Sequence, residues 1–329
     1  MNSNKPGSNI FYTPDYMVSE NLRIVFMGTP DFAVESLRIL VEHGYNIVGV
    51  ITAPDKPRGR GRKPAPSPVK QYALKAGLHI LQPANLKAPE FLQQLADLSA
   101  NLQIVVAFRM LPRAVWEMPE LGTFNLHASL LPDYRGAAPI HWAIINGERK
   151  TGVTTFFLQH EIDTGEIILQ EEELIGPDDS VGDLYERLMV KGANLVLKTV
   201  RLIESGDVST NPQDPDAAHH PAPKLFRENT EIDFNRLTAD IHNFIRGLSP
   251  FPAAWFNLDN EIVKILKSHP VPMKAGQPGS FETDQKTFWH IHTGDGGIAV
   301  DELQWQGKKR MQIEDFLRGN DIPIKNTDS

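Results

Sequence analysis

The chain has 329 residues, of which 41% are hydrophobic and 22% charged, with 33 basic against 41 acidic side chains. A mean hydropathy of -0.29, with no apolar run near the ~18 residues of a membrane-spanning helix, excludes a membrane protein, and the length predicts about two domains. The absence of cysteine excludes a disulfide scaffold, a thiol nucleophile and a cysteine-ligated zinc site. The net charge of -8 argues against attraction to nucleic acid or an anionic membrane over the whole surface, and the cytoplasm is the expected compartment.

Residues 1–20 are rich in Ser, Asn and Pro and predict a loosely ordered extension. Buried strands and amphipathic helices then alternate. Thr29 suits a helix N-cap and Pro30 the first helical position, because proline lacks the N–H group that a first turn leaves unbonded. Strands are expected at residues 23–27, 46–52, 104–108 and 123–127, and a further helix at residues 90–98. This order predicts an α/β, Rossmann-like domain with a mainly parallel sheet between two layers of helices.

The next stretch predicts strands at residues 153–158 and 166–174, a turn at Asp163-Thr164-Gly165 between them, and a helix at residues 183–203. A proline-rich polar segment then predicts a linker. A helix over residues 237–245 and many short alternating strands follow, which is typical of a small, OB-like β-barrel. The expected divisions are an N-terminal extension, a first domain, a linker, a second domain and a tail, at residues 1–20, 21–208, 209–224, 225–322 and 323–329.

Two glycine motifs resemble phosphate-binding loops, but neither has the full pattern. The sequence GTPDFA lacks the second glycine that lets a pyrophosphate approach, so a tight turn at Gly28 is the better interpretation. The segment from Gly59 to Lys63 lacks the G-K-[ST] ending of a P-loop. Pro68 and the two prolines before it should also prevent a helix after this segment.

The same segment has an unusual charge. Six cations lie close to a single acid, Asp55: Lys56, Arg58, Arg60, Arg62, Lys63 and Lys70. A solvated surface loop is the simplest interpretation. We favour an arm that contacts phosphate groups and becomes ordered when it binds them. An acidic protein has little reason to concentrate positive charge unless an anion binds there.

Asn125, His127 and Asp163 form the strongest candidate site. Asn125 and His127 are two residues apart on a predicted strand, so they project from one face near its carboxyl end, where open α/β sheets bind ligands. Asp163 lies in a later turn from which it could reach the imidazole. Such a trio suits acyl transfer, because the amide and imidazolium stabilise an oxyanion while the carboxylate orients the imidazole and raises its pKa. For each residue alone, a structural role is the simpler interpretation.

Residues 129–140 follow His127 and combine two prolines and a glycine with a short apolar sequence. By itself such a segment is a packed connection. Next to His127 it could line a pocket for a flat heteroaromatic ligand.

Motifs in both expected domains resemble one family. The sequences NLHASLLPDYRGAAPIHWAIINGERKTGV and HEIDTGEIILQ are similar to those of the folate-dependent formyltransferases. FMGTPDFA, TAPDKPRGRGRKPAPSPVK, APKL, IRGLSPFPAAW and LQWQGKKRMQIEDFLRG are similar to the members that act on methionyl-tRNA. The resemblance covers about residues 23–319, and its motifs keep family-like spacing, which makes it specific.

The resemblance implies the reaction and its participants. The chain is expected to be an enzyme that transfers the formyl group of its cosubstrate, 10-formyltetrahydrofolate, to the free amine of initiator methionyl-tRNA for translation initiation. It implies that Asn125, His127 and Asp163 are the catalytic trio. Folate is expected at Ser129, Leu130, Leu131 and Pro132, and tRNA at Arg58, Arg60, Arg62 and Lys63. The second domain is expected to hold the tRNA from its other side.

One position departs from the family. Where members often have a Tyr-Gly pair before I-L-P, this chain has Phe108-Arg109-Met110-Leu111-Pro112. Arg109 therefore adds a positive charge near the expected folate pocket.

Two other functions remain open. A related folate enzyme could formylate an amino sugar or a purine-precursor amine, although a small acceptor would not need the basic loop. A noncatalytic RNA-binding protein could use the loop and the β-barrel, although the trio argues against it. No metal is expected, because the histidines at positions 219, 220, 290 and 292 have no third ligand at a recognised spacing. We also expect a monomer that does not associate with membranes.

Overall fold

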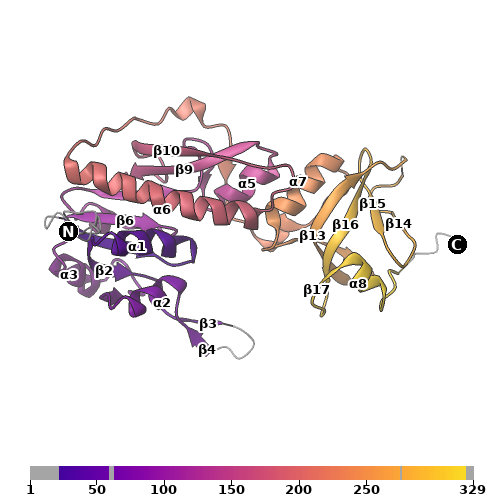
Figure 1. The fold of residues 1–329 in the computed structure, drawn as a ribbon, viewed down its shortest axis with the longest axis horizontal. Helices are drawn as coiled ribbons and strands as arrows, with labels where there is room; N and C mark the ends of the chain where they lie inside the picture. Colours follow the sequence, from indigo (N-terminus) through magenta and orange to yellow (C-terminus); the bar gives the residue numbers. More distant parts are fainter. Residues whose placement is uncertain (1–21, 59–62, 275, 324–329) are drawn as a thin grey trace, which may run out of the picture.

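The structure, a computed structural model, describes residues 22–58, 63–274 and 276–323 and holds two main β-sheets that follow one another along the chain (Figure 1). The expected extension at residues 1–20 lies outside the described residues, as do Arg60, Arg62 and all but the first residue of the expected tail. The helices α5 (Pro139–Ile145) and α7 (Thr238–Leu248) lie between the two sheets and pack on each other.

Within the described chain, the first sheet has seven strands in the order β10-β9-β7-β6-β1-β2-β5. Its parallel strands are β1 (Arg23–Gly28), β2 (Asn46–Ile51), β5 (Ile80–Leu81), β6 (Leu102–Val106) and β7 (Thr123–His127). The strands β9 (Lys150–Phe157) and β10 (Ile167–Leu174) add an antiparallel edge. The predicted mainly parallel α/β sheet is confirmed.

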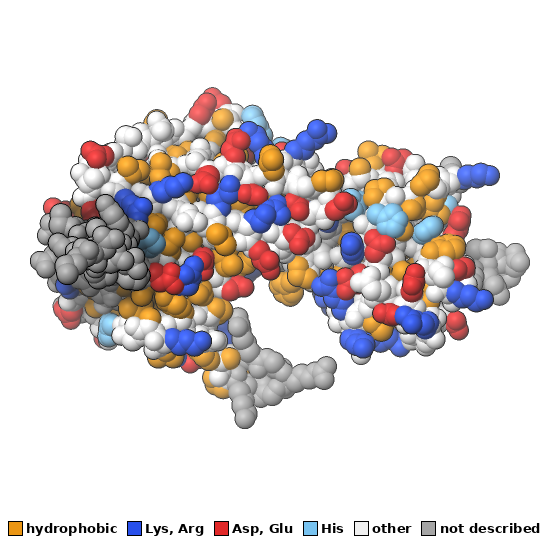
Figure 2. Space-filling view, viewed as in Figure 1, with side chains coloured by type: hydrophobic (Ala, Val, Ile, Leu, Met, Phe, Trp, Pro, Cys, Tyr) orange, Lys and Arg blue, Asp and Glu red, His pale blue; other side chains and the backbone are white. Residues whose placement is uncertain are grey.

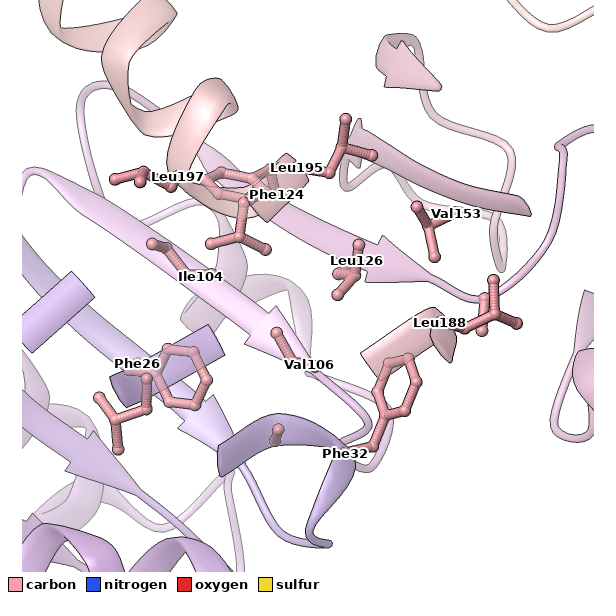
Figure 3. Close-up of a cluster of buried hydrophobic side chains, with 14 of the residues drawn as sticks. Phe26, Phe32, Ile104, Val106, Phe124, Leu126, Val153, Leu188, Leu195 and Leu197 are labelled. Carbon is pink, nitrogen blue, oxygen red and sulfur yellow. The ribbon is translucent and has the colours of Figure 1, made fainter. Parts of the chain in front are cut away.

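Helices cover both faces of this sheet. One face carries α1 (Phe32–Glu42), α2 (Pro68–Lys75), α5 and α6 (Val181–Ser205), and the other carries α3 (Pro89–Asp97) and α4 (Arg113–Trp116). Because strand side chains alternate between faces, Phe26 joins the first cluster and its neighbour Met27 the second. The first cluster also contains Phe32, Leu126 and Leu188 (Figure 3).

Two helices begin elsewhere than the sequence predicts. The first begins at Phe32 rather than Pro30, and its cap is Asp31 rather than Thr29, since the Asp31 carboxylate accepts the Phe32 backbone N–H at 3.1 Å. The helix α2 begins at Pro68, so the expectation that prolines would prevent a helix there is wrong. Proline is tolerated in a first turn, where its missing N–H loses no hydrogen bond, and the Ser67 hydroxyl caps this helix.

Two short ribbons lie beside the first sheet. The strands β3 (Lys56–Arg58) and β4 (Lys63–Ala65) pair antiparallel and project from the first domain as an arm (Figure 1). The strand β8 (Arg135–Gly136) pairs with β11 (Pro221–Ala222), which belongs to the expected linker. The linker therefore runs along the first domain instead of spanning open solvent. The 3₁₀ turns η1 (Pro215–Ala217) and η2 (Arg227–Thr230) flank β11.

The second sheet is curled and antiparallel, as the predicted small β-barrel requires. Its strands pair in the order β12-β13-β16-β15-β14, and β17 pairs with β16. They are β12 (Ala254–Leu258), β13 (Glu261–Val271), β14 (Phe281–Thr283), β15 (Trp289–His292), β16 (Gly297–Trp305) and β17 (Arg310–Gln312). The helices α7 and α8 (Ile313–Leu317) pack on its core, in which Trp289 is fully buried. No helix of the described ranges is long and apolar enough to cross a membrane.

The two sheets are joined by direct contacts as well as by the linker. Arg246 of α7 is buried and donates hydrogen bonds to the backbone oxygens of Gly176 and Asp179, at 3.3 and 3.0 Å. Ile145 of α5 belongs to the apolar core of the second sheet. These contacts hold the second sheet close to the segment that follows β10 of the first sheet.

Candidate active site

A cavity of about 710 Å³, here called the main cavity, opens where β6 and β7 end. Most of its lining is apolar and includes Phe32, Leu111, Trp116 and Ile140. Asn125, His127 and Asp163 also line it. The structure thus brings the predicted trio together at the carboxyl ends of parallel strands, where open α/β sheets bind ligands.

Asn125 lines the main cavity, and its amide oxygen is unpaired within the described part of the chain. The residue sits in the middle of β7, two positions before His127, so both side chains leave the same face. The amide oxygen is buried and has no hydrogen-bond partner among the described residues. Buried polar atoms are nearly always paired, so an unpaired one at a cavity wall is typical of a group that meets a ligand.

His127 is held in one orientation by the backbone. Its Nε2 lies 2.8 Å from the carbonyl oxygen of Tyr134. Because a carbonyl only accepts, Nε2 carries the hydrogen and donates it. Nδ1 is therefore the basic nitrogen of the neutral ring, and it lies 3.9 Å from Oδ2 of Asp163. This distance is too long for a hydrogen bond but short enough for a strong charge interaction when the ring is protonated.

Asp163 lies in the turn between β9 and β10 in a left-handed conformation, with φ of 55°. Its Oδ2 accepts the backbone N–H of Gly136 at 3.0 Å, which holds the carboxylate toward His127. Gly136 has φ of 128°, and a side chain there would collide with the Ala222 backbone. The geometry therefore requires a glycine at the point that anchors the carboxylate.

Two further residues support this turn, and the first of them could not be predicted from the sequence. Gln213 of the linker donates to the backbone oxygens of Asp163 and Gly165, at 2.9 and 2.8 Å. Arg135 donates to Gln213 Oε1 and, at 3.1 Å, to the Asp163 backbone oxygen. Gln213 is one polar residue in a polar segment, so only the path of the linker reveals its role. Arg135 lies within the motif that carries the family resemblance.

The four residues expected to bind folate are not among those that line the main cavity. Ser129 and Leu131 are buried. The Ser129 backbone oxygen accepts the Thr154 hydroxyl at 2.7 Å, and the Leu131 backbone oxygen accepts the Gln170 amide at 2.8 Å. These bonds draw the segment toward β9 and β10. The cavity wall is formed instead by Ala128 and by the residues from Gly136 to His141.

Tyr185 closes another wall of the main cavity. Its hydroxyl donates to Oδ1 of Asp31 at 2.6 Å and accepts the Phe32 backbone N–H at 3.0 Å. Burial, together with the neighbouring Asp31 carboxylate, raises the pKa of Tyr185. The hydroxyl therefore stays protonated at neutral pH and ties α6 to the start of α1.

The structure describes only part of the basic loop. Arg58 ends β3 and lies opposite Lys63, which begins β4. Arg60 and Arg62 fall between them, outside the described residues. At the base of the arm, Lys70 Nζ forms an ion pair with Asp55 at 2.7 Å.

A second cavity of about 650 Å³, here called the junction cavity, adjoins the main cavity and shares Ala137, Ala138 and His141 with it. Its lining combines cations with aromatic rings: Lys224, Phe226, Arg227, Phe251, Trp255 and Lys264. Lys224 lies over the Phe226 ring and Arg227 over the Trp255 ring, 5.3 and 5.1 Å from the centroids. Figure 2 also shows Lys and Arg side chains gathered on the second domain beside the notch between the domains. Such a lining suits an anionic, aromatic ligand.

Among the described residues, no group of three or more His, Asp or Glu side chains is arranged to hold a metal ion. His269 is paired with Asp301 at 2.9 Å, and His292 lies 3.5 Å from Glu282. The expectation that no metal takes part in the reaction stays a prediction.

Comparison with known proteins identifies relatives of both halves. Residues 22–200 match the family described as formyl transferase, and residues 224–321 match the formyl transferase C-terminal domain. The methionyl-tRNA formyltransferases of Bacteroides fragilis and Parabacteroides distasonis are each 55% identical to the chain, over 312 and 314 residues. Both matches cover 92% of this chain, and they cover 96% and 97% of those proteins.

A solved structure has a similar fold. The crystal structure of WlaRD, a sugar 3N-formyl transferase in the presence of dTDP and 5-N-formyl-THF, matches with a TM-score of 0.63 and 22% sequence identity. The match covers 88% of this chain and 99% of WlaRD. At this identity the likeness establishes the fold.

Proposed function

The chain belongs to the formyl transferase family, and we propose that it transfers the formyl group of 10-formyltetrahydrofolate to the free α-amine of initiator methionyl-tRNA in translation initiation. The observation that carries the proposal is the 55% identity, over 92% of the chain, to the methionyl-tRNA formyltransferase of Bacteroides fragilis. The family expected from the motifs is confirmed, and the chain is an enzyme of the transferase class.

The main cavity is the proposed site of the formyl donor. A folate is a flat heteroaromatic ring with an extended tail, which suits a cavity of about 710 Å³ lined mostly by apolar side chains. The presence of 5-N-formyl-THF in the WlaRD crystals supports a folate as donor. Since Ser129–Pro132 do not line the cavity, we propose that they support its wall and that Ala128 and the residues from Gly136 to His141 contact the donor.

The proposed catalytic groups are Asn125, His127 and Asp163. The amine nitrogen attacks the formyl carbon and forms a C–N bond, and the carbonyl oxygen becomes an oxyanion. The Asn125 amide and the protonated His127 stabilise this oxyanion, and Nδ1–H is the ring donor that Tyr134 leaves free for it.

The bond from the formyl carbon to N10 then breaks, and N10 takes a proton as the amine loses one. The Asp163 carboxylate lies 3.9 Å from Nδ1, beside the positive charge of the imidazolium, and accepts the amine proton through water.

The acceptor is proposed to reach the main cavity through the junction cavity. Single-stranded nucleic acid binds where cations meet its phosphates and aromatic rings stack on its bases. The junction cavity offers both, beside Ala137 and His141 of the main cavity. We propose that it receives the 3′ end of the tRNA while the basic arm with Arg58, Arg60, Arg62 and Lys63 contacts the acceptor stem.

Further expectations complete the proposal. We propose that the chain acts as a monomer in the cytoplasm and that its two domains have the boundaries expected from the sequence, with the linker packed along the first domain and supporting it. Sedimentation velocity at micromolar concentration tests the monomer. A dimer at that concentration would contradict it.

The decisive experiment is a side-by-side transfer assay with the purified full-length chain. With 10-formyltetrahydrofolate as donor, we expect formylation of initiator methionyl-tRNA and none of an amino-sugar nucleotide. Formylation of the sugar alone would establish the alternative acceptor. Binding of methionyl-tRNA without formyl transfer would instead indicate a noncatalytic RNA-binding protein.

A further inference from the structure

The ionisable residues that line the main cavity are unevenly distributed. His127 is buried and Asp163 is partly buried beside the proposed reaction centre, and Tyr185 closes one wall. The lining also includes His141, His160 and the exposed Glu161. Arg109 is the one lining residue, within the described chain, whose side chain carries a permanent positive charge. It is exposed, so it lies at the opening of the cavity rather than beside the trio.

Local contacts hold the Arg109 guanidinium in place. It follows β6 by three residues, after Ala107, whose φ of 46° turns the chain away from the strand. Nη1 donates to the backbone oxygen of Ala84 at 2.9 Å, and Nη2 donates to the backbone oxygen of Pro83. The guanidinium carbon lies 5.6 Å from the centroid of the Phe108 ring. The side chain is therefore positioned before any ligand arrives.

The guanidinium retains capacity for an anion. A guanidinium has five N–H groups, and backbone oxygens take only two of those on Arg109. No carboxylate in the described part of the chain forms an ion pair with Arg109, whereas the nearby Arg113 is paired with Glu117 at 2.7 Å. Arg109 thus offers an anchored and unneutralised cation at the cavity opening, which suits a carboxylate.

The proposed donor has a carboxylate in a matching place. In 10-formyltetrahydrofolate the formyl group is on N10, between the pterin ring and an aminobenzoyl tail that ends in glutamate. With the formyl carbon beside Asn125 and His127 and the pterin ring in the interior of the cavity, the tail leads toward the opening.

We propose that Arg109 binds the glutamate carboxylate of the folate donor and so contributes to selection of glutamate-bearing folates. This inference rests on the proposed function, in that it takes the donor to be a folate. Arg109 acts in binding and positioning of the donor and takes no part in formyl transfer itself.

Paired ligands test the proposal without any transfer reaction. Tetrahydrofolate carries the glutamate, and in tetrahydropteroyl amide a neutral amide replaces it, so that the second ligand has no carboxylate. Calorimetric titration of the full-length chain should show that Arg109→Ala weakens tetrahydrofolate binding about fivefold, as expected for loss of ~1 kcal/mol from an exposed charge pair. Binding of tetrahydropteroyl amide should not change, and Arg109→Lys should retain part of the affinity for tetrahydrofolate.

Arg113→Ala is the matched control. It removes the same charge at a position four residues after Arg109, and the Arg113 side chain does not line the main cavity. It should leave the affinity for both ligands unchanged. In the transfer assay, Arg109→Ala should raise KM for 10-formyltetrahydrofolate about fivefold without changing kcat, because the transferred group is remote from the tail.

The possible outcomes separate clearly. Equal weakening of both ligands by Arg109→Ala would overturn the proposal, since it would mean that Arg109 merely supports the loop through Ala84 and Pro83. Unchanged binding of tetrahydrofolate, or binding of neither ligand by the wild-type chain, would overturn it as well. The proposed function is judged separately, by formylation of methionyl-tRNA by the wild-type chain.

Discussion

The amide oxygen of Asn125 is buried and has no partner among the residues that the structure describes. Leaving such an atom unpaired costs about 1–3 kcal/mol, which a purely structural residue would avoid. The same side chain lines the main cavity two positions before His127, whose ring is fixed by the Tyr134 carbonyl. Together these features favour a role in the reaction over a role in stability, with the amide nitrogen as the donor to the oxyanion and the amide oxygen free to accept a hydrogen bond from a ligand.

The first prediction follows from this contrast. Asn125→Ala should lower kcat for formylation by about 10²–10³, the usual effect of removing one oxyanion donor. Its melting temperature should stay close to wild type, because no hydrogen bond to the amide oxygen is lost. Single-turnover formylation and calorimetric melting measure the two effects. A wild-type rate, or a loss of activity that only parallels unfolding, would contradict the assignment.

His127→Ala should cause a larger loss of kcat than Asn125→Ala. It removes the proposed imidazolium donor and also leaves the Tyr134 carbonyl without its hydrogen-bond partner. The matched control is His79→Ala, which removes an exposed histidine outside the main cavity. Single-turnover rates of both variants provide the test, and comparable rates would refute a special role for His127.

The sequence predicted the trio because two of its members follow simple rules. A strand has a period of two, so Asn125 and His127 had to share a face, and the turn pattern placed Asp163 between two strands. The 3.9 Å separation of Asp163 and His127 could not be derived, because it depends on how β9 and β10 pack. The contact of Gln213 with the Asp163 turn could not be predicted either, because the two residues are 50 positions apart in the sequence.

Among the secondary-structure elements, α1 shows how one side chain can serve two purposes. Asp31 caps the helix through the Phe32 backbone N–H and also accepts the Tyr185 hydroxyl of α6 at 2.6 Å. The rings of Phe32 and Tyr185 pack edge to face beside it, with centroids 5.2 Å apart. The start of α1 and one turn of α6 are therefore stabilised together.

Asp31→Ala should accordingly lower the free energy of unfolding by about 1–2 kcal/mol, the cost of a lost cap and of an unpaired, partly buried hydroxyl. Urea unfolding is the measurement. Glu90→Ala is the control, because this acid lies in the first turn of α3, whose cap makes no side-chain hydrogen bond. Equal destabilisation by the two substitutions would argue against the capping role.

Predictions for these elements were most reliable where apolar residues were continuous. Runs such as those of β1 and β2 have one interpretation, because a buried parallel strand needs apolar side chains on both faces. Boundaries were less predictable. The strand β6 ends at Val106, two residues early, because Ala107 adopts a positive φ, and α2 begins at Pro68 because Ser67 caps it.

The molecule as a whole is acidic, yet its proposed substrate is a polyanion. The net charge of -8 means that tRNA must be attracted locally, and the basic arm and the junction cavity are the places where cations gather. These places lie in different parts of the fold, so they would contact the tRNA at separate points. We therefore expect their contributions to be separable by substitution.

Arg60→Ala should raise KM for methionyl-tRNA and leave the affinity for the folate donor unchanged. The slope of log KM against log salt concentration should fall by about one, as expected when one phosphate contact is lost. Steady-state assays at several salt concentrations measure this slope. A variant with weakened folate binding but a normal KM for tRNA would contradict the placement of tRNA on the arm.

Phe251→Ala should raise KM for methionyl-tRNA about tenfold, because base stacking on an aromatic ring contributes ~1–3 kcal/mol. The ring is 78% exposed at the junction cavity, so its removal should not destabilise the fold. Leu237→Ala is the control, since it truncates another exposed apolar side chain, 54% accessible, outside both cavities. An equal KM for the two variants would show that no base stacks on Phe251.

The contacts of Gln213 bear on how the protein can be divided. The catalytic half does not end with α6 at Ser205, because the chain continues past the Asp163 turn and supports it before reaching the second sheet. The pairing of β11 with β8 then places Ala222 against Gly136, whose N–H anchors the carboxylate. A fragment cut just after α6 would keep every strand of the first sheet and still lose the outer support of its proton acceptor. A fragment that keeps this support therefore has to extend to about residue 223, and so has to include the segment that the sequence predicts to be a linker.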